Sequence, residues 1–395
     1  MKLKVVPQDF IVEEVADLEI SRARGPYAVY RLTKSSWDTF DLLDLLSRRM
    51  GVPRDALSVG GMKDRHGKTT QTITVRSTGR CPKSISDKNF HAELEGYSQS
   101  PVSARAVRGN KFSLILRDMT DTEVRWAGIN LRAAESTGIP NYYDEQRFGS
   151  ARHGGGFMGK SIFLGRREEA LRLYFLASKH DDQKTRKLKK LVTEKWGRWS
   201  ECMGSAFGEY GRILSYLSAH PRAFHKALSV IDRRFLVFAL NAYQSYLFNE
   251  VLRRRIQGLA EKHAFPIKSL KYAFGTFLFP ESLNEAARNE LTGMELPVPG
   301  YDTEVEDPVV RAIVDEVVGA EGIQLSDLRV RQMRRLEIHG IMRPAMTRLG
   351  ELEGPRVDPD ELYPGRMKMS ISFFLPRGSY ATILIKRISL PPAAR

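Results

Sequence analysis

The residues most able to do chemistry lie in one short segment, residues 60–71, whose sequence is GGMKDRHGKTTQ. Asp64 stands there between two cations, Lys63 and Arg65. Neighbouring cations lower the pKa of a carboxylate and keep it ionised, as a nucleophile requires. The alternative is an aspartate that caps a turn, with solvated Lys and Arg side chains beside it. On this segment alone, the preferences of turn residues favour that alternative.

The same segment superficially suggests a phosphate-binding P-loop, because Gly67-Lys68-Thr69 matches the end of that motif. The spacing is wrong, since five residues separate Gly61 from Gly67 where the motif needs four. The context is wrong as well, because a P-loop opens a helix and residues 70–76 alternate as a strand does. We therefore do not expect a nucleotide-hydrolysing enzyme.

Four further segments give the Lys-Asp segment a context. They are GNKF at 109–112, PNYYDEQRFG at 140–149, NAYQSYLFN at 241–249 and LPRGSYAT at 375–382. These five segments, in this order, resemble the TruD family of tRNA pseudouridine synthases. The resemblance covers nearly the whole chain, from Asp9-Phe10 to the tail, and its Lys-Asp and Gln-Arg-Phe-Gly motifs are the most specific.

The resemblance implies isomerisation of a uridine in tRNA to pseudouridine, at position 13 in the best-known members of the family. The N-glycosidic bond breaks, the uracil rotates, and carbon 5 rejoins the ribose. Asp64 is then the catalytic residue, as a nucleophile or as an ion-pair stabiliser where positive character develops at a sugar carbon. One glycosidic bond replaces another, so we expect no nicotinamide, metal or ATP. Histidines and cysteines do not cluster at metal-ligand spacings.

The uridine must leave the base stack, so its pocket needs a stacking aromatic and polar groups for the base edge. By resemblance, the substrate-binding residues are Phe10, Asn110, Phe112, Tyr380 and Lys4. Phe112 is the expected stacking residue, Asn110 offers a donor and an acceptor to uracil, and Lys4 is the expected partner of Asp64. Core packing is the alternative for each aromatic, since Phe112 shares a strand face with Leu114 and Leu116.

Two positions depart from the family's pattern. Gly67 stands where the family usually has alanine, and residues 141–144 read Asn-Tyr-Tyr-Asp instead of Asn-Tyr-Phe-Gly. Neither departure involves Asp64. Tyr142, Tyr143, Arg147 and Phe148 either line a cleft or anchor a domain junction, and the sequence favours neither role.

The periodicity of the chain predicts the elements that position these residues. Both ends are rich in strands, and the middle is helical. We expect strands at 27–32, 70–76, 111–117, 368–375 and 380–386, and helices at 38–50, 168–177, 184–195 and 233–256. In the 38–50 helix, Phe40, Leu43 and Leu46 should share the packed face. The 241–249 segment should form core, because Tyr243 and Leu247 share an apolar stripe.

This order suggests one domain built from both chain ends and interrupted by an insertion, and the family resemblance implies the same arrangement. The fold class is α/β (α+β). We expect a pseudouridine-synthase catalytic domain from residues 1–147 and 346–395, with a central, mostly antiparallel sheet flanked by helices. Residues 148–345 should form an inserted α/β TRUD domain.

The composition is consistent with a partner that is a polyanion. The 395 residues include 62 Lys+Arg and 47 Asp+Glu, which give a formal net charge of +15. Such an excess favours nucleic acid over a membrane surface. Candidate contacts to the RNA backbone are Lys63, Arg65, Arg147, Arg331, Arg334 and Arg335. A non-catalytic RNA-binding or ribosome-assembly factor would explain the charge equally well. It would not explain Asp64 in a Lys-Asp turn together with Asn110 and Phe112 in the context that matches the family.

The remaining features indicate a soluble cytoplasmic protein. Only two cysteines occur, Cys81 and Cys202, so no disulfide framework is expected. The N-terminus lacks an apolar core of signal-peptide length, and no uncharged run is long enough to span a membrane. We expect tRNA as the partner, no protein partner, and a monomer.

Overall fold

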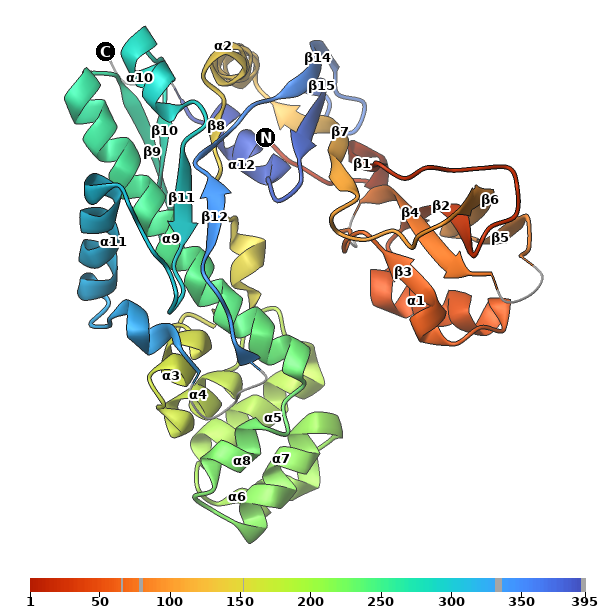
Figure 1. Cartoon of the computed structure of the whole chain (residues 1–395), viewed down its shortest axis with the longest axis vertical. Coiled ribbons are helices and arrows are strands. Elements are labelled where there is room, and N and C mark those ends of the chain that lie inside the picture. Colours follow the sequence, from red (N-terminus) through yellow and green to blue (C-terminus); the bar gives the residue numbers. More distant parts are fainter. Residues whose placement is uncertain (65–66, 78–80, 152, 331–335, 392–395) are drawn as a thin grey trace. The chain divides into compact units, whose positions relative to one another are not determined.

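The computed structural model describes residues 1–64, 67–77, 81–151, 153–330 and 336–391. They form two compact units (Figure 1). Unit 1 comprises residues 1–139 and 347–395, and unit 2 comprises residues 140–346. The chain therefore leaves unit 1, builds unit 2, and returns to complete unit 1.

Unit 1 is built on a nine-stranded sheet. Its strands are β1 (Phe10–Ala16), β2 (Tyr27–Ser35), β3 (Leu57–Val59), β4 (Lys68–Arg76), β5 (Ser84–Asp87), β6 (Phe90–Ser98), β7 (Val107–Met119), β14 (Gly350–Pro359) and β15 (Met367–Pro376). The order is β14-β15-β7-β1-β4-β2-β6-β5, with β3 beside β4. The β1–β4 pair is parallel and the other pairs are antiparallel, which confirms the predicted mostly antiparallel sheet.

The register of the strands places a row of side chains, from Phe112 to Phe90, on one face of the sheet. Residues directly opposite each other in neighbouring strands point to the same side of a sheet. Phe112 pairs with Val12, Val12 with Thr69, Thr69 with Lys34, and Lys34 with Phe90. Along this row, one face carries apolar side chains on β7, β1 and β6 and polar side chains on β4 and β2.

Helices pack against this sheet at both ends (Figure 1). Helix α1 (Thr39–Met50) begins at Asp38, whose carboxylate accepts a hydrogen bond from the amide of Phe40 at 2.8 Å, and it ends at Gly51 in the left-handed region. This confirms the predicted 38–50 helix. Its packed face carries Leu42, Leu43 and Leu46, which join strands β2, β4 and β6 in one apolar cluster. Phe40 was expected on that face but is exposed, because it lies beside the stripe formed by these leucines.

The other end is covered by α2 (Asp121–Thr137) and α12 (Ala381–Ile388), which pack on each other. Asn130 of α2 donates hydrogen bonds to the carbonyls of Ile388 and Leu390, at 3.1 and 2.7 Å. The prediction of a strand at 380–386 was wrong. A short apolar run does not distinguish a strand from a buried helix, and the buried residues Ala381, Leu384 and Ile388 follow a helical period.

Unit 2 is mostly helical. Its helices are α3 (Met158–Phe163), α4 (Arg167–Tyr174), α5 (Gln183–Glu194), α6 (Trp199–Cys202), α7 (Gly208–Ala219), α8 (Phe224–Leu228), α9 (Arg233–His263), α10 (Glu285–Leu291) and α11 (Pro308–Ala320). Its strands are β9 (Ile267–Tyr272), β10 (Gly275–Pro280), β11 (Glu295–Val298) and β12 (Ile341–Pro344). The short strands β8 (Ile139–Pro140) and β13 (Met346–Thr347) pair where the chain passes between the units. Tyr243 and Leu247 are buried in α9, as the apolar stripe predicted.

The chain enters unit 2 at residue 140, earlier than the expected boundary at 147/148. The cause is local packing. The ring of Tyr142 lies 4.9 Å from that of Phe277, and Tyr143 exchanges backbone hydrogen bonds of 2.9 Å with the side chain of Asn249. These contacts attach residues 142–143 to α9 and β10 of unit 2.

A buried charge cluster ties the two ends of the chain together within unit 1. The guanidinium of Arg117 donates hydrogen bonds to Asp9 at 2.8 Å and to Asp360 at 2.9 Å. All three side chains are buried. Burial alone would raise the pKa of Asp360, but hydrogen bonds from the amides of Asp118 and Leu362 and from Arg117 outweigh it and lower that pKa.

We expect the Arg117→Leu variant to lose about 3–5 kcal/mol of unfolding free energy, because two buried carboxylates lose their cation. Urea unfolding followed by tryptophan fluorescence measures the loss. The control is Arg366→Gln, which breaks the more exposed pair with Asp118 and should change the free energy little. Equal free energies of unfolding in the two variants would show that the buried charge cluster does not stabilise the fold more than the exposed pair does.

The same cluster predicts a pH dependence. A carboxyl group with a lowered folded-state pKa stabilises the fold above its unfolded value and loses that effect as the pH falls through the folded value. The urea midpoint of the wild-type protein should therefore fall below about pH 4. The Arg117→Leu variant should show a weaker fall; an identical fall in both proteins would exclude Asp360 as a contributor.

Candidate active site

Asp64 lies in the loop between β3 and β4, at the edge of the sheet where β1 and β4 begin and β2 ends. Its carboxylate forms an ion pair with the ammonium of Lys4, the partner that the family resemblance implied. The side chains of Lys4 and Asp64 are 22% and 26% exposed. The pair is therefore partly shielded from water but remains accessible to a substrate.

The segment that carries Lys4 is fixed on both sides. On one side, the backbones of Lys2 and Arg117 exchange hydrogen bonds of 2.7 and 2.9 Å. On the other side, Asp9 binds the Arg117 guanidinium and accepts a hydrogen bond from the amide of Val6 at 3.0 Å. Lys4 lies between these anchors with a φ of 58°, and its Nζ lies 4.0 Å from the ring centroid of Phe10. The buried charge cluster thus holds the cation that faces Asp64.

Lys63 points into the protein instead of toward solvent. Its side chain is 8% exposed, and its Nζ lies 2.6 Å from a carboxylate oxygen of Glu14 and 2.7 Å from Oδ1 of Asn110. Glu14 and Asn110 are opposite each other in β1 and β7. We therefore revise the expectation that Lys63 contacts the RNA backbone, because its charge is already paired. Lys63 instead connects the Asp64 loop to the middle of the sheet.

Lys34 anchors the same loop from β2. This buried lysine donates hydrogen bonds to the carbonyl oxygens of Trp37 at 2.9 Å, Asp64 at 3.0 Å and Lys63 at 3.4 Å. Burial lowers its pKa, although the negative charges of Asp38 and Asp64 oppose that effect. The hydroxyl of Thr39 accepts a further bond from the amide of Lys63 at 3.3 Å. The backbone of residues 63–64 is thus held by side chains rather than by a helix or strand.

The structure places Phe10 and Phe112 next to each other, close to Lys4. Their ring centroids are 6.2 Å apart with the rings edge to face, and Phe112 also stacks on Phe373 of β15 at 5.4 Å. Phe112 is 7% exposed and Phe10 is 4% exposed. The burial is compatible with core packing and with a closed pocket for a base, so the two interpretations of Phe112 both stand.

The C-terminal segment runs beside Asn110. Pro376 and Leu375 of β15 pair with Gly109 and Asn110 of β7, and Tyr380 follows as the residue preceding α12. A side chain at position 109 would not fit, because a Cβ there would lie 2.2 Å from the carbonyl oxygen of Leu375. Gly109 therefore lets the two strands approach at the position that presents Asn110.

Gly67, one of the departures from the family's pattern, has a similar explanation. It is buried, and a Cβ at this position would lie 2.6 Å from the carbonyl oxygen of Phe10. The backbone of Phe10 occupies the space that the family's usual alanine would need. The departure thus reflects how closely β1 approaches the start of β4.

The other candidates lie in unit 2 or outside the described residues. Arg147 donates a hydrogen bond to the hydroxyl of Ser245 at 3.1 Å, and its guanidinium lies 5.5 Å from the ring centroid of Tyr143. Tyr142 and Phe148 are buried within the same unit. Arg65, Arg331, Arg334 and Arg335 lie outside the described residues.

Sequence reasoning missed Lys34, Glu14 and Arg117 as supporting residues. A usable signal existed for the first two. Lys34 falls at the next alternate position after the apolar residues Ala28, Tyr30 and Leu32. Glu14 does the same after Phe10 and Val12. A charged side chain on a buried strand face needs a partner. Arg117 offers no comparable signal, because its partners lie more than 100 positions away in the chain.

Within the described ranges, no group of three His, Cys, Asp or Glu side chains is arranged to hold a metal ion. No helix among the same residues is both long and apolar enough to cross a membrane.

Comparisons with known proteins agree with the resemblance noted in the sequence. The family described as tRNA pseudouridine synthase D (TruD) matches residues 1–388. A protein of Methanococcus maripaludis described as a probable tRNA pseudouridine synthase D 1 is 31% identical over 399 residues, covering 98% of this chain and 99% of the relative. The tRNA pseudouridine synthase D of Leptospira interrogans is 28% identical, covering 98% and 96% of the two chains.

A solved structure supports the fold independently. The crystal structure of a Methanosarcina mazei protein described as TruD superposes with a TM-score of 0.73 and covers 98% of this chain and 93% of that one, at 24% identity. Both units therefore follow an architecture already seen in a crystal. From the family match over residues 1–388 and the 31% identical relative, the chain belongs to the TruD family of tRNA pseudouridine synthases.

Proposed function

We propose that this chain isomerises uridine 13 of tRNA to pseudouridine with Asp64 as the nucleophile and without a cofactor. The observation that carries the proposal is the Lys4–Asp64 ion pair, which lies beside Phe10 on a loop held by Lys34 and Lys63. The choice of position 13 rests on the family resemblance alone. Ion pairing and fixation are what a carboxylate nucleophile needs in order to remain ionised and aligned.

The reaction is balanced without any added group. The bond between carbon 1 of the ribose and N1 of uracil breaks, and a bond from that sugar carbon to carbon 5 forms. Carbon 5 loses its proton and N1 gains one. The Asp64 carboxylate holds the separated fragments by bonding to one of them, and attack on the ribose and attack on the base both fit this role.

Asn110 and Phe112 are suited to hold the flipped base. Oδ1 of Asn110 is occupied by Lys63, which leaves the amide nitrogen to donate to a carbonyl oxygen of uracil. Phe112 supplies a ring face on the side of the sheet that carries Asn110. Flipping a base costs a few kcal/mol, and stacking with hydrogen bonds offsets it.

The net charge of +15 serves binding rather than chemistry. Lysine and arginine contacts to phosphates supply most of the affinity for a nucleic acid and do not depend on its sequence. Loss of the Asp64 charge should therefore reduce turnover without reducing the affinity for tRNA.

We expect Asp64→Asn to lower turnover by about a thousandfold or more, because the amide is not a nucleophile. Binding of the tRNA should persist. A uridine-13 tRNA transcript incubated without cofactor, followed by chemical mapping of pseudouridine, measures turnover, and filter binding measures affinity. Asp17→Asn, at an exposed aspartate just after β1, is the matched control. If the two variants turned over at the same rate, Asp64 would not be the nucleophile.

We expect Lys34→Met to lower kcat by about tenfold to a hundredfold with little change in KM, because the carbonyls of residues 63 and 64 lose their donor and the loop shifts. Lys271→Met, at an exposed lysine of β9, controls for loss of one positive charge. Thermal melting tests whether the fold persists. A wild-type kcat in a folded Lys34→Met protein would show that the loop does not depend on this anchor.

Phe373, which stacks on Phe112, provides a control that distinguishes base stacking by Phe112 from core packing. Phe112→Leu should lower kcat/KM by about tenfold or more, because stacking of a base on an aromatic ring is lost. Phe373→Leu should destabilise the fold to a similar extent and change kcat/KM much less. Equal kinetic losses in both variants would assign Phe112 to the core.

A further inference from the structure

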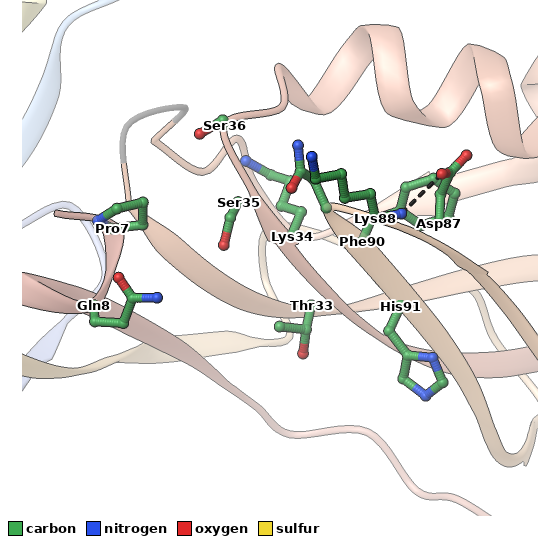
Figure 2. A pocket seen from close by; sticks show the side chains of 11 residues that line it. Pro7, Gln8, Thr33, Lys34, Ser35, Ser36, Asp87, Lys88, Phe90 and His91 are labelled. Atoms are coloured by element: carbon green, nitrogen blue, oxygen red, sulfur yellow. Dashed lines mark hydrogen bonds between the residues drawn. The ribbon is translucent and has the colours of Figure 1, made fainter.

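A polar hollow of about 390 Å³ lies at the edge of the unit 1 sheet where β2 ends and β6 begins (Figure 2). Pro7 and Gln8 lie on one side of it, and Lys88 and Phe90 lie on the other, with Thr33 and Ser35 between them. The hollow contains none of the residues proposed to hold uracil. Its volume is in the range of pockets that take small molecules.

The lining of the hollow suits an anionic ligand with hydrogen-bonding edges. Among the described residues, the side chains of Gln8, Ser36, Lys88 and Asn89 have no hydrogen-bond or ion-pair partner. Its carboxylate, Asp87, is already bound by Arg49 at 2.5 Å and by the amide of Lys88 at 2.8 Å, the bond dashed in Figure 2. The hollow therefore offers an ammonium group, amides and a hydroxyl, while its negative charge is neutralised.

Two parts of the hollow's lining also contact the Asp64 loop or the segment that carries Lys4. Lys34 lines the hollow, and its ammonium binds the carbonyl oxygen of Asp64. Pro7 and Gln8 belong to the same anchored segment as Lys4, which pairs with the Asp64 carboxylate. A ligand seated here would lie next to the catalytic loop and would not occupy the Asn110–Phe112 side.

We propose that this hollow binds the RNA nucleotide next to the target uridine, with Lys88 on its phosphate and Gln8 on its base. The proposal rests on the proposed function and extends it to a subsite. When a base is flipped, its chain neighbour loses a stacking partner, and enzymes that act on flipped bases contact these flanking nucleotides. The apolar ring of Pro7 and the amides of Gln8 and Asn89 provide a surface for such a base, and Lys88 supplies the charge for its phosphate.

The first experiment compares Lys88→Ala and Gln8→Ala with the wild-type protein on a tRNA transcript. Both variants should raise KM by about fivefold, as expected for loss of one hydrogen-bonded contact, and leave kcat nearly unchanged. Lys88→Ala should also reduce the slope of log affinity against log salt by about one. Both residues are exposed, so thermal melting should be unchanged.

The matched control is Lys83→Ala. Lys83 is an exposed lysine that precedes β5 and does not line the hollow. It should keep the KM and the salt slope of the wild-type protein. If Lys88→Ala and Gln8→Ala behaved as Lys83→Ala does, the proposal would be overturned.

The second experiment identifies the nucleotide. Transcripts carrying an abasic residue immediately 5′ or 3′ of the target uridine are tested with wild type and Gln8→Ala. On one of the two transcripts, the wild-type KM should rise and the effect of Gln8→Ala should disappear, since the contact is already absent. An effect of Gln8→Ala that persists on both transcripts would exclude a contact between Gln8 and a flanking base.

Failure of the proposed function would be recognisable separately, as absence of pseudouridine with wild-type protein. Filter binding of the same transcripts would then test the hollow by itself. Weaker binding by Lys88→Ala than by Lys83→Ala would support a nucleotide site, and equal binding would exclude it.

Discussion

The structure depends on fixing an ionised carboxylate on a loop that has no regular secondary structure. Asp64 cannot be aligned by helix or strand hydrogen bonds, so lysine ammonium groups replace them. Lys34 binds its backbone carbonyl, Lys4 binds its carboxylate, and the neighbouring Lys63 binds Glu14 and Asn110 in the sheet. Cations perform two tasks in this arrangement, because they hold the chain in place and favour the charged form of the carboxylate.

Burying these charged groups costs free energy, and contacts with the rest of unit 1 must offset that cost. A buried ammonium loses its hydration, and only close acceptors offset that loss. The sheet supplies these acceptors because β1, β4, β2 and β7 are adjacent and in register, so that Glu14, Asn110 and Lys34 project from one face. The segment bearing Lys4 depends in turn on Arg117, which binds Asp9 near the start of the chain and Asp360 near its end. The N-terminal and C-terminal parts of the chain are thus joined by the same buried charge that orients the site.

The Asp64 loop and the helical unit are built from different parts of the chain. Unit 2 has its own core around α9, and its aromatic residues Tyr142, Tyr143 and Phe148 pack within it. The Asp64 loop, its lysines and the hollow beside them are built entirely from unit 1.

The sequence by itself determined what depends on local order. Residue periods predicted the central strands and the long helix, and the ordered motifs predicted the family and the pairing of Lys4 with Asp64. Local patterns failed at residues 380–386, because a short apolar run is compatible with both a strand and a buried helix. Residues 381–386 belong to a helix that packs against α2. Only the tertiary structure decided that Lys63 turns inward to Glu14, that Lys34 anchors the Asp64 loop, and that Arg117 joins both chain ends. The physical reason is that these contacts are set by strand register and by which face a side chain shares, and both arise only when distant segments pair.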